Sequence, residues 1–226
     1  MAQPLARRYD GAMQLGGLYV LIDPTACGGR DPVAVGRAAL AGGASMLQWR
    51  DKLRDKGEQL PDARALYESC IEHDAAFILN DHADLALVFA VDGPPRSGAI
   101  GVHVGQKDLP LREVRRIVPA HFVVGVSTNN PDEALAAEHD GASYVAVGDI
   151  FGTSSKQGTR AASPERLAQV RANVSVPVIG IGGINLTNLD QVIGAGADGI
   201  AVISAICGAP DPEAAARALV EAMRAL

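Results

Sequence analysis

Positive charge and cysteine are both scarce in this chain of 226 residues. Its 20 lysines and arginines are outnumbered by 26 acidic residues, and the formal net charge of −6 argues against a nucleic-acid binder. A site for a polyanion would therefore have to gather its cations locally. The three cysteines, Cys27, Cys70 and Cys207, lie far apart and form no CxxC pair, so we expect reduced thiols in a cytoplasmic protein.

Long apolar runs, low-complexity tracts and internal linkers are also missing from the sequence. No apolar stretch approaches the length of a membrane span, so we expect no membrane partner. The first residues include Arg7 and Arg8 but lack the apolar run of a signal peptide. We predict a loosely held N-terminal arm over residues 1–16 and one domain over residues 17–226. The oligomeric state stays open, a homo-oligomer included.

The sequence does contain a regular alternation of two kinds of segment. Short β-branched runs predict buried parallel strands, and the stretches rich in Ala, Leu and Arg between them predict helices. The expected strands are residues 18–22, 45–50, 76–80, 100–104, 122–126 and 144–147, with two more within 178–206. Eight strand–helix units predict an α/β fold, a single (β/α)8 TIM barrel. A doubly wound open sheet is the structural alternative.

Prolines mark several expected helix starts. Asp31-Pro32 has the character of an N-cap and first turn, and Pro61 is expected to open the next helix, which runs to about His73. The segment 91–98 contains Pro94-Pro95 and two glycines, which exclude regular structure. It precedes the strand at 100–104 and would lie at the end of a barrel opposite the chemistry, so we interpret it as a surface loop.

Two strand ends near the C-terminus suggest a phosphate site. Gly182-Gly183 follow one strand, and Ile203-Ser204 lead from the next strand into a helix start. Glycine lets the backbone approach a ligand closely, and free N–H groups at a helix start attract an anion. Barrels place such a cradle after strands seven and eight. The alternative is that the glycines only shape tight turns.

Polar residues at the end of the second strand form another candidate site. Alternation puts Gln48 and Arg50 on one face and Trp49 on the other. If Gln48 and Arg50 point into the barrel mouth, Trp49 packs under the helices, and Lys52 follows in the next turn. The alternative is a solvated turn of charged residues.

Carboxylates follow the next two strands. Asn80-Asp81 end the third strand, and Asp108 follows the fourth. Taken singly, each aspartate suits a helix cap. Taken together, Asp81 and Asp108 would share a Mg²⁺, a hard cation usually held by one or two carboxylates plus substrate phosphates.

Hydroxyl groups complete the candidate residues. Ser127 ends the fifth strand, and the polar loop after the sixth strand carries Thr153, Ser155 and Lys156. Hydroxyls and a lysine in such a loop suit phosphate binding, and a flexible polar lid is the alternative. The five histidines show no metal spacing, and none is assigned a catalytic role. Whether His103 faces the barrel interior stays open.

The motifs at the strand ends, taken in their order along the chain, resemble those of the thiamine phosphate synthase family over residues 18–206. The motif Gln-x-Arg-x-Lys falls on Gln48, Arg50 and Lys52, and the Asn-Asp pair falls on Asn80 and Asp81. Further elements match Gly105, Gln106 and Asp108, then Gly125, Val126 and Ser127, then Thr153, Ser155 and Lys156, then residues 181–184 and 202–206. Each motif alone is weak, and their common order is a strong signal.

The resemblance implies a TIM-barrel enzyme that joins two phosphorylated small molecules. They are 4-amino-5-hydroxymethyl-2-methylpyrimidine diphosphate and 4-methyl-5-(2-phosphooxyethyl)thiazole, and the products are thiamine phosphate and pyrophosphate. If the family's residue roles hold at the matching positions, the pyrimidine diphosphate would be held by Gln48, Arg50, Lys52, Asn80, Ser127 and Lys156. The catalytic residues among them would be Arg50, Lys52, Ser127 and Lys156. Asp81 and Asp108 would hold Mg²⁺, and Thr153, Ser155, Gly183, Ile203 and Ser204 would hold the thiazole phosphate.

The implied chemistry needs no general base. The pyrimidine amino group can feed electrons to the methylene cation left by pyrophosphate, and the thiazole nitrogen then attacks. Positive charge from Arg50, Lys52, Lys156 and Mg²⁺ would stabilise the departing pyrophosphate. The sequence departs from the family pattern in a longer 91–98 loop, in Ser155 for Thr, and in a strand-six loop without the usual prolines, at 148–152.

Two other functions stay open. A sister family of thiazole tautomerases shares the barrel and resembles the 177–206 stretch equally well. That family tends to lack the counterpart of Asp108 and carries a histidine after Gly-Val-Ser, where this chain has Thr128-Asn129. A non-catalytic barrel that only binds a phosphorylated ligand is the second alternative, and a turnover assay separates it from either enzyme.

Overall fold

The computed structural model describes residues 6–9, 13–90, 99–152 and 160–226, so the predicted loop at 91–98 lies outside the described residues. Strands and helices alternate along most of the chain, as the sequence predicts. The elements are β1 (Ala6–Tyr9), β2 (Met13–Ile22), α1 (Pro32–Ala41), β3 (Met46–Trp49), α2 (Lys56–Glu72), β4 (Ala76–Asn80), α3 (Ala83–Leu87), the 3₁₀ helix η1 (Val88–Ala90), β5 (Ile100–Val104), α4 (Leu111–Ile117), β6 (Val123–Thr128), α5 (Pro131–His139), β7 (Tyr144–Val147), α6 (Pro164–Asn173), β8 (Val178–Ile181), α7 (Leu189–Gly194), β9 (Gly199–Val202), α8 (Ser204–Cys207) and α9 (Pro212–Arg224).

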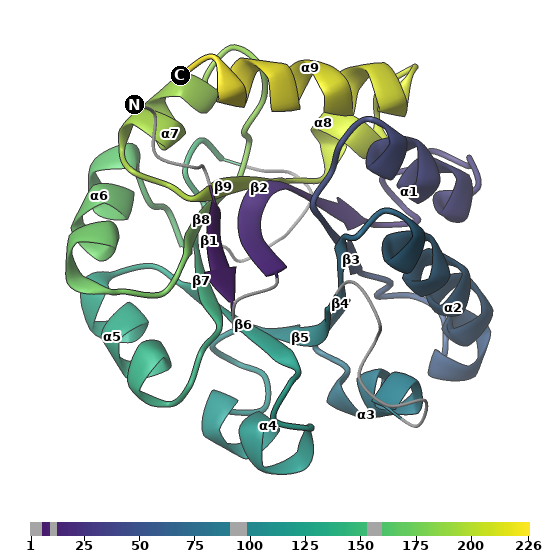
Figure 1. Cartoon of the computed structure of the whole chain (residues 1–226), viewed down its shortest axis with the longest axis horizontal. Helices are drawn as coiled ribbons and strands as arrows, with labels where there is room; N and C mark the ends of the chain where they lie inside the picture. Colours follow the sequence, from purple (N-terminus) through teal and green to yellow (C-terminus); the bar gives the residue numbers. More distant parts are fainter. Residues whose placement is uncertain (1–5, 10–12, 91–98, 153–159) are drawn as a thin grey trace.

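Strands β2 to β9 form a closed parallel barrel, and the helices surround it as an outer ring (Figure 1). Each barrel strand pairs with the next one in sequence, and β2 pairs with β9 to close the sheet. This closure confirms the predicted (β/α)8 barrel and excludes the open sheet. Because all the barrel strands run in one direction, their C-terminal ends meet at one end of the barrel.

The beginning of the chain is more ordered than the sequence suggests. Strand β2 begins at Met13 instead of residue 18, and β1 pairs with it antiparallel, from Ala6 opposite Gly16 to Tyr9 opposite Met13. Part of the segment predicted as a loosely held arm therefore forms strands. Leu15 is fully buried in the barrel interior, and this burial favours the longer strand. Figure 1 shows β1 crossing the end of the barrel at which β2 begins.

Helix α2 also begins earlier than predicted, at Lys56 instead of Pro61. The Glu58 carboxylate accepts a hydrogen bond of 3.3 Å from the Asp55 N–H, which satisfies one end of a capping box. Pro61 therefore lies inside the helix, where it cannot donate to the carbonyl of Gly57. Gly57 is exposed, so water can satisfy that carbonyl and the helix tolerates the proline.

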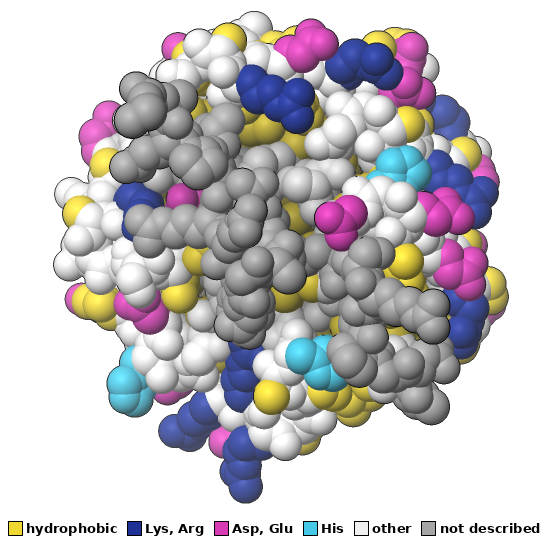
Figure 2. All heavy atoms as spheres, viewed as in Figure 1, with side chains coloured by type: hydrophobic (Ala, Val, Ile, Leu, Met, Phe, Trp, Pro, Cys, Tyr) yellow, Lys and Arg dark blue, Asp and Glu magenta, His cyan; other side chains and the backbone are white. Residues whose placement is uncertain are grey.

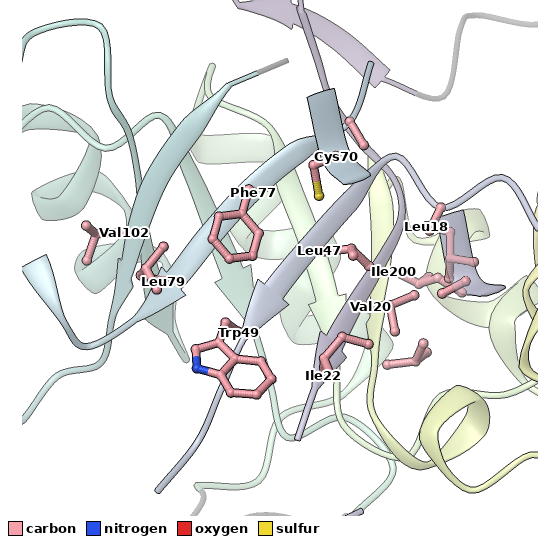
Figure 3. Close-up of a cluster of buried hydrophobic side chains, with 14 of the residues drawn as sticks. Leu18, Val20, Ile22, Leu47, Trp49, Cys70, Phe77, Leu79, Val102 and Ile200 are labelled. Carbon is pink, nitrogen blue, oxygen red and sulfur yellow. The ribbon is translucent and has the colours of Figure 1, made fainter. Parts of the chain in front are cut away.

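Two apolar layers hold the barrel together. One fills the barrel interior and includes Tyr19, Met46 and Tyr144, and the other lies between the strands and the helices. Figure 3 shows part of the second layer, with Leu47 and Trp49 of β3 on the helix-facing side of the sheet. Full burial of one large apolar side chain contributes roughly 1.5–3 kcal/mol to the free energy of folding. The alternation fixes which residues of each strand face inward.

The described surface carries charge of both signs. In Figure 2, Lys and Arg side chains and Asp and Glu side chains both occur around the edge of the face in view. Among the described helices, none combines the length and the apolar character that crossing a membrane requires.

Candidate active site

A cavity of about 480 Å³ lies at the C-terminal ends of the barrel strands. All the predicted site residues that the structure describes line this cavity: Gln48, Arg50, Lys52, Asn80, Asp81, Asp108, Ser127, Gly183, Ile203 and Ser204. They come from six different strand ends, and the fold brings them together. The other predicted residues, Thr153, Ser155 and Lys156, lie outside the described residues.

Strand β3 has the predicted orientation. Gln48 and Arg50 line the cavity, whereas Trp49 is 1% exposed and packs in the layer under the helices. The Trp49 Nε1–H donates a 3.1 Å hydrogen bond to Oε1 of Gln59 on α2. This bond and the burial of the indole fix the register, because a shift by one residue would exchange the two faces.

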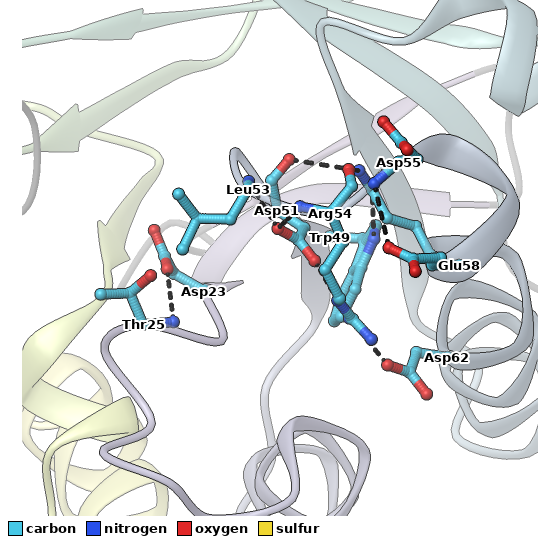
Figure 4. Close-up of polar contacts among 10 residues, drawn as sticks. Asp23, Thr25, Trp49, Asp51, Leu53, Arg54, Asp55, Glu58 and Asp62 are labelled. Atoms are coloured by element: carbon cyan, nitrogen blue, oxygen red, sulfur yellow. Dashed lines mark hydrogen bonds and ion pairs between the residues drawn. The ribbon is translucent and has the colours of Figure 1, made fainter.

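The loop after β3 is held by a cluster of charges around Asp51 (Figure 4). Asp51 accepts hydrogen bonds from the N–H groups of Leu53 and Arg54, at 2.9 and 3.1 Å, and from Nε of Arg54 at 2.5 Å. Arg54 also bonds Asp62 at 2.8 Å and lies 5.4 Å from the centre of the Trp49 ring. Burial raises the pKa of Asp51, but these hydrogen bonds outweigh burial and hold the pKa below its usual value. The cluster thereby fixes the backbone on both sides of Lys52.

Arg50 is paired with a carboxylate that the sequence analysis missed. Its Nη1 contacts Oδ2 of Asp23, and both side chains are largely buried. The other Asp23 oxygen accepts a 2.9 Å hydrogen bond from the Thr25 N–H. Asp23 could have been predicted as a site residue from its position directly after Ile22, at the end of the first barrel strand.

Lys52 is paired in the same way with Asp81. The Lys52 ammonium contacts Oδ2 of Asp81, and Nδ2 of Asn80 donates a 2.7 Å hydrogen bond to the same oxygen. The Asp81 N–H donates a 2.8 Å bond to the His103 carbonyl, which ties the end of β4 to β5. Two cations of the cavity are therefore each neutralised by a neighbouring carboxylate.

The alternative that Asp81 and Asp108 cap the helices that follow them is wrong. The residues at the cap positions of α3 and α4 are His82 and Pro110. Asp108 instead accepts a 2.8 Å bond from the Gly105 N–H within its own turn.

Both carboxylates nevertheless suit part of a metal site. Asp81 and Asp108 follow β4 and β5, which pair in the sheet, and both line the cavity. Hard cations such as Mg²⁺ prefer carboxylate oxygens. Within the described residues, no group of three or more His, Cys, Asp and Glu side chains forms a metal cage. The donor set therefore fits an ion that takes its other ligands from water and substrate.

The two glycine positions after β8 bring the backbone close to the cavity. Gly182 and Gly183 have φ values of +106° and +64°, in the region that favours glycine. A Cβ on Gly182 would lie 2.0 Å from Oδ1 of Asp149, and one on Gly183 would lie 2.4 Å from the Gly152 carbonyl. The two glycines thus allow the loops after β7 and β8 to pack closely, and the approach of this backbone to a phosphate stays a prediction. Ser204 begins α8 beside it and is exposed.

His103 and Tyr19 are among the polar residues of the cavity that were not predicted as site residues. The sequence left the direction of His103 open, and the structure places it inside the barrel, with Nε2 at 2.9 Å from the Ser127 hydroxyl. Tyr19 lies on β2 with its hydroxyl 2.5 Å from Nε2 of Gln48. Side chains alternate between the two faces of a strand, so the pattern along residues 18–22 could have indicated that Tyr19 points into the barrel.

Arg160 adds a cation that the sequence analysis did not assign. It lines the cavity and forms two hydrogen bonds to the Glu133 carboxylate, of 2.6 and 2.7 Å. These bonds hold the pKa of Glu133 below its usual value, against the opposing effect of partial burial. Nδ2 of Asn129 donates at 3.1 Å to the carbonyls of Gly148 and Arg160, so the loop after β7 is fastened to β6 at both its described ends.

Comparison with known proteins agrees with this arrangement. The sequence model described as thiamine monophosphate synthase matches residues 18–206. The chain is 41% identical to the thiamine-phosphate synthase of Methanospirillum hungatei, over 92% of this chain and 97% of the relative. It is 45% identical to that of Moorella thermoacetica, over 90% and 94%.

A solved structure shares the fold as well. The thiamine phosphate pyrophosphorylase from Pyrococcus furiosus superimposes with a TM-score of 0.81 at 35% identity, covering 92% of this chain and 96% of that one. The matched range contains the barrel strands β3 to β9 and the second half of β2. The chain belongs to the thiamine monophosphate synthase family.

Proposed function

We propose that this protein is a thiamine phosphate synthase that joins the pyrimidine diphosphate to the thiazole phosphate and releases pyrophosphate. The observation that carries the proposal is the convergence of Arg50, Lys52, Asp81 and Asp108 at one cavity in a chain of this family. The names of the relatives indicate the reaction. The cavity offers the cations and carboxylates that a diphosphate leaving group with its metal would require.

The pyrimidine diphosphate would bind at the ends of β3, β4 and β6. Arg50, Lys52 and Lys156 would bind its phosphate oxygens, and Gln48, Asn80 and Ser127 would hold the rest of the molecule. Arg50 and Lys52 already pair with Asp23 and Asp81, so the incoming diphosphate would compete with those carboxylates. A diphosphate offers several charged oxygens at once, and this favours the exchange.

Asp81 and Asp108 would hold Mg²⁺ next to the diphosphate. Their carboxylates suit the ion, and diphosphate and water oxygens would complete its ligands. When bound, Mg²⁺ would neutralise charge that develops on the departing pyrophosphate. This assignment gives the carboxylates of Asp81 and Asp108 a role in a cavity that would bind anionic substrates.

The thiazole phosphate would bind at the ends of β8 and β9. Gly183 allows its backbone to approach the phosphate, and Ile203 and Ser204 lie at the start of α8. Thr153 and Ser155 of the loop after β7 would add hydroxyl donors. The two phosphate groups would therefore bind on different strands, with the reacting carbon and nitrogen atoms between them.

The reaction would break the bond between the pyrimidine methylene carbon and the diphosphate oxygen. The electron pair leaves with pyrophosphate, and the lone pair of the thiazole nitrogen forms the new C–N bond. No proton moves in these steps, so no general base is needed. Arg50, Lys52 and Lys156 would stabilise the negative charge, and Gln48, Asn80 and Ser204 would hold the partners in line.

Mixing the purified protein with both compounds and Mg²⁺ tests the proposal. We expect thiamine phosphate and pyrophosphate to form only when all three are present. Isomerisation of a thiazole phosphate on its own would point to the tautomerase, and binding without turnover would point to a non-catalytic barrel. The relatives named above favour the synthase over both alternatives.

A further inference from the structure

A network of five polar side chains crosses the barrel interior from Gln48 to Ser127. Gln48 Nε2 lies 2.5 Å from the Tyr19 hydroxyl, which lies 2.9 Å from the hydroxyl of Tyr144. The Tyr144 hydroxyl lies 3.0 Å from Nδ1 of His103, whose Nε2 lies 2.9 Å from Oγ of Ser127. We call these residues the interior network. It links five strands of the barrel through side chains alone.

The hydrogen bonds of the network have a direction because the Gln48 atom that contacts Tyr19 is the amide nitrogen, which can only donate. The amide nitrogen of Gln48 donates a hydrogen bond to the Tyr19 oxygen, which leaves the Tyr19 hydroxyl proton for a bond to Tyr144. We assign the remaining bonds in the same direction, so that Tyr19 donates to Tyr144 and Tyr144 donates to Nδ1 of His103. Burial raises the pKa of both tyrosines, so both hydroxyls keep their protons. With Nδ1 of His103 accepting from Tyr144, the ring proton lies on Nε2, which donates to Ser127.

Each end of the network consequently presents a defined group to the cavity. Oε1 of Gln48 is buried and accepts no hydrogen bond from the residues the structure describes. A buried amide oxygen needs a donor, which a ligand N–H would supply. At the other end, Ser127 accepts from His103, so its own hydroxyl proton is available for an acceptor such as a phosphate oxygen. Reversing the network would exchange both properties together.

Tyr144 occupies the middle of the network and does not line the cavity. It is 0% exposed, its ring meets Tyr19 edge-on and stacks on His103, and it packs against β6. A Cβ on Gly125 would lie 2.0 Å from Cζ of Tyr144, so the glycine of the Gly-Val-Ser element makes room for the ring. Gly125 thus leaves room for a phenol that lies behind the lining of the cavity.

We propose that Tyr144 is a positioning residue that orients the Gln48 amide and the Ser127 hydroxyl through Tyr19 and His103, so that the cavity accepts a hydrogen bond at one end and donates one at the other. This pattern selects a molecule with an amino group and a phosphate, and this part rests on the proposed function. The residue acts through its neighbours, since its side chain is buried and does not line the cavity.

The first test uses the wild-type protein and nitrogen NMR of the histidine side chains, with His103 assigned by comparison with His103→Gln. The network requires the ring proton of His103 to lie on Nε2, with Nδ1 as the acceptor. A proton on Nδ1 would reverse the direction and overturn the proposal. This result does not depend on turnover, so it decides the network even if the protein makes no thiamine phosphate.

The second test is Tyr144→Phe, which keeps the ring and removes the hydroxyl. We expect His103 to lose its preference for a single form, and the kcat/KM for the pyrimidine diphosphate to fall about fivefold to a hundredfold, with KM for the thiazole phosphate within about twofold of wild type. The matched control is Ser143→Ala. It removes a buried hydroxyl directly before the same strand, which accepts bonds from Val124 N and Arg115, and should leave both KM values unchanged.

A double variant separates positioning from general destabilisation. If Tyr144 acts through Ser127 and Gln48, Tyr144→Phe should cost less in a Ser127→Ala background than in wild type. Equal costs in both backgrounds, or a Tyr144→Phe protein with wild-type constants and an unchanged His103 form, would overturn the proposal. If Tyr144→Phe does not fold, the wild-type NMR result alone decides.

Discussion

The Lys52 ammonium and the Asp81 carboxylate form an ion pair between the ends of β3 and β4. The pair matters because the two residues have different proposed partners, diphosphate for Lys52 and Mg²⁺ for Asp81. Neither partner can bind fully until the pair opens. Metal and substrate should therefore bind cooperatively, each releasing the residue that the other needs, with equal coupling in both directions.

Replacing Lys52 with Met should strengthen Mg²⁺ binding in the absence of substrate and weaken catalysis. Lys52 is half exposed, so loss of its pairing should raise metal affinity only about two- to fivefold, while turnover falls at least tenfold. Calorimetric titration with Mg²⁺ measures the first effect, and steady-state kinetics the second. The control is Lys56→Met, which removes a lysine of similar exposure that pairs with Asp84 outside the cavity. Unchanged metal affinity in Lys52→Met would contradict the shared role of Asp81.

Asp81→Asn and Asp108→Asn should each require much more Mg²⁺ for activity and lose most of their turnover. An amide oxygen is neutral and holds a hard cation less well than a carboxylate. Titrating Mg²⁺ against activity measures the change. Asp84→Asn, on the surface of α3, should behave as wild type. Wild-type titration curves from both cavity variants would exclude these two aspartates as the metal ligands.

Ser204→Ala should weaken the binding of the thiazole phosphate and leave the pyrimidine diphosphate largely unaffected. Loss of one hydrogen bond to a charged group costs roughly 1.5–3 kcal/mol, or about tenfold to a hundredfold in affinity. Separate KM values for the two substrates give the result. Ser163→Ala, which removes the N-cap of α6 outside the cavity, should change stability and neither KM. An equal loss for both substrates would mean that the two phosphate sites are not divided in this way.

Asp51→Asn should destabilise the fold at neutral pH by roughly 1–3 kcal/mol, because a buried carboxylate with several donors is replaced by a neutral group. The folded-state pKa of Asp51 lies below its unfolded value, so its contribution is complete above the unfolded pKa of about 3.9 and is lost as pH falls through the folded pKa. Urea unfolding at several pH values should show the difference from wild type shrinking below about pH 4. A difference that is constant with pH would show that the carboxylate charge does not contribute.

The barrel and the residues at its strand ends could be predicted because they depend on local patterns. Apolar strands alternating with helices specify a parallel sheet, and alternation within 45–50 puts Gln48 and Arg50 opposite Trp49. The C-terminal ends of parallel strands then meet at one end of the barrel. Residues far apart in sequence, such as Lys52 and Ser204, could therefore be assigned to one cavity without knowledge of any contact.

What could not be predicted depends on contacts between distant residues or on competing local signals. The bond between Tyr19 and Tyr144 joins positions 125 residues apart, and no spacing reveals it. At Pro61, the proline signal is outweighed by the capping residues Asp55 and Glu58. Met13 becomes part of β2 only because β1 pairs with it.

The most direct measurement of the proposed reaction is a phosphorus NMR time course of the protein with both substrates and Mg²⁺. The proposed chemistry predicts that the pyrimidine diphosphate signals disappear while pyrophosphate and thiamine phosphate appear in equal amounts, and that a chelator stops the change. Orthophosphate without thiamine phosphate would mean that water, not the thiazole nitrogen, attacks. Persistence of both substrates under conditions in which both are bound would contradict the proposed synthase activity.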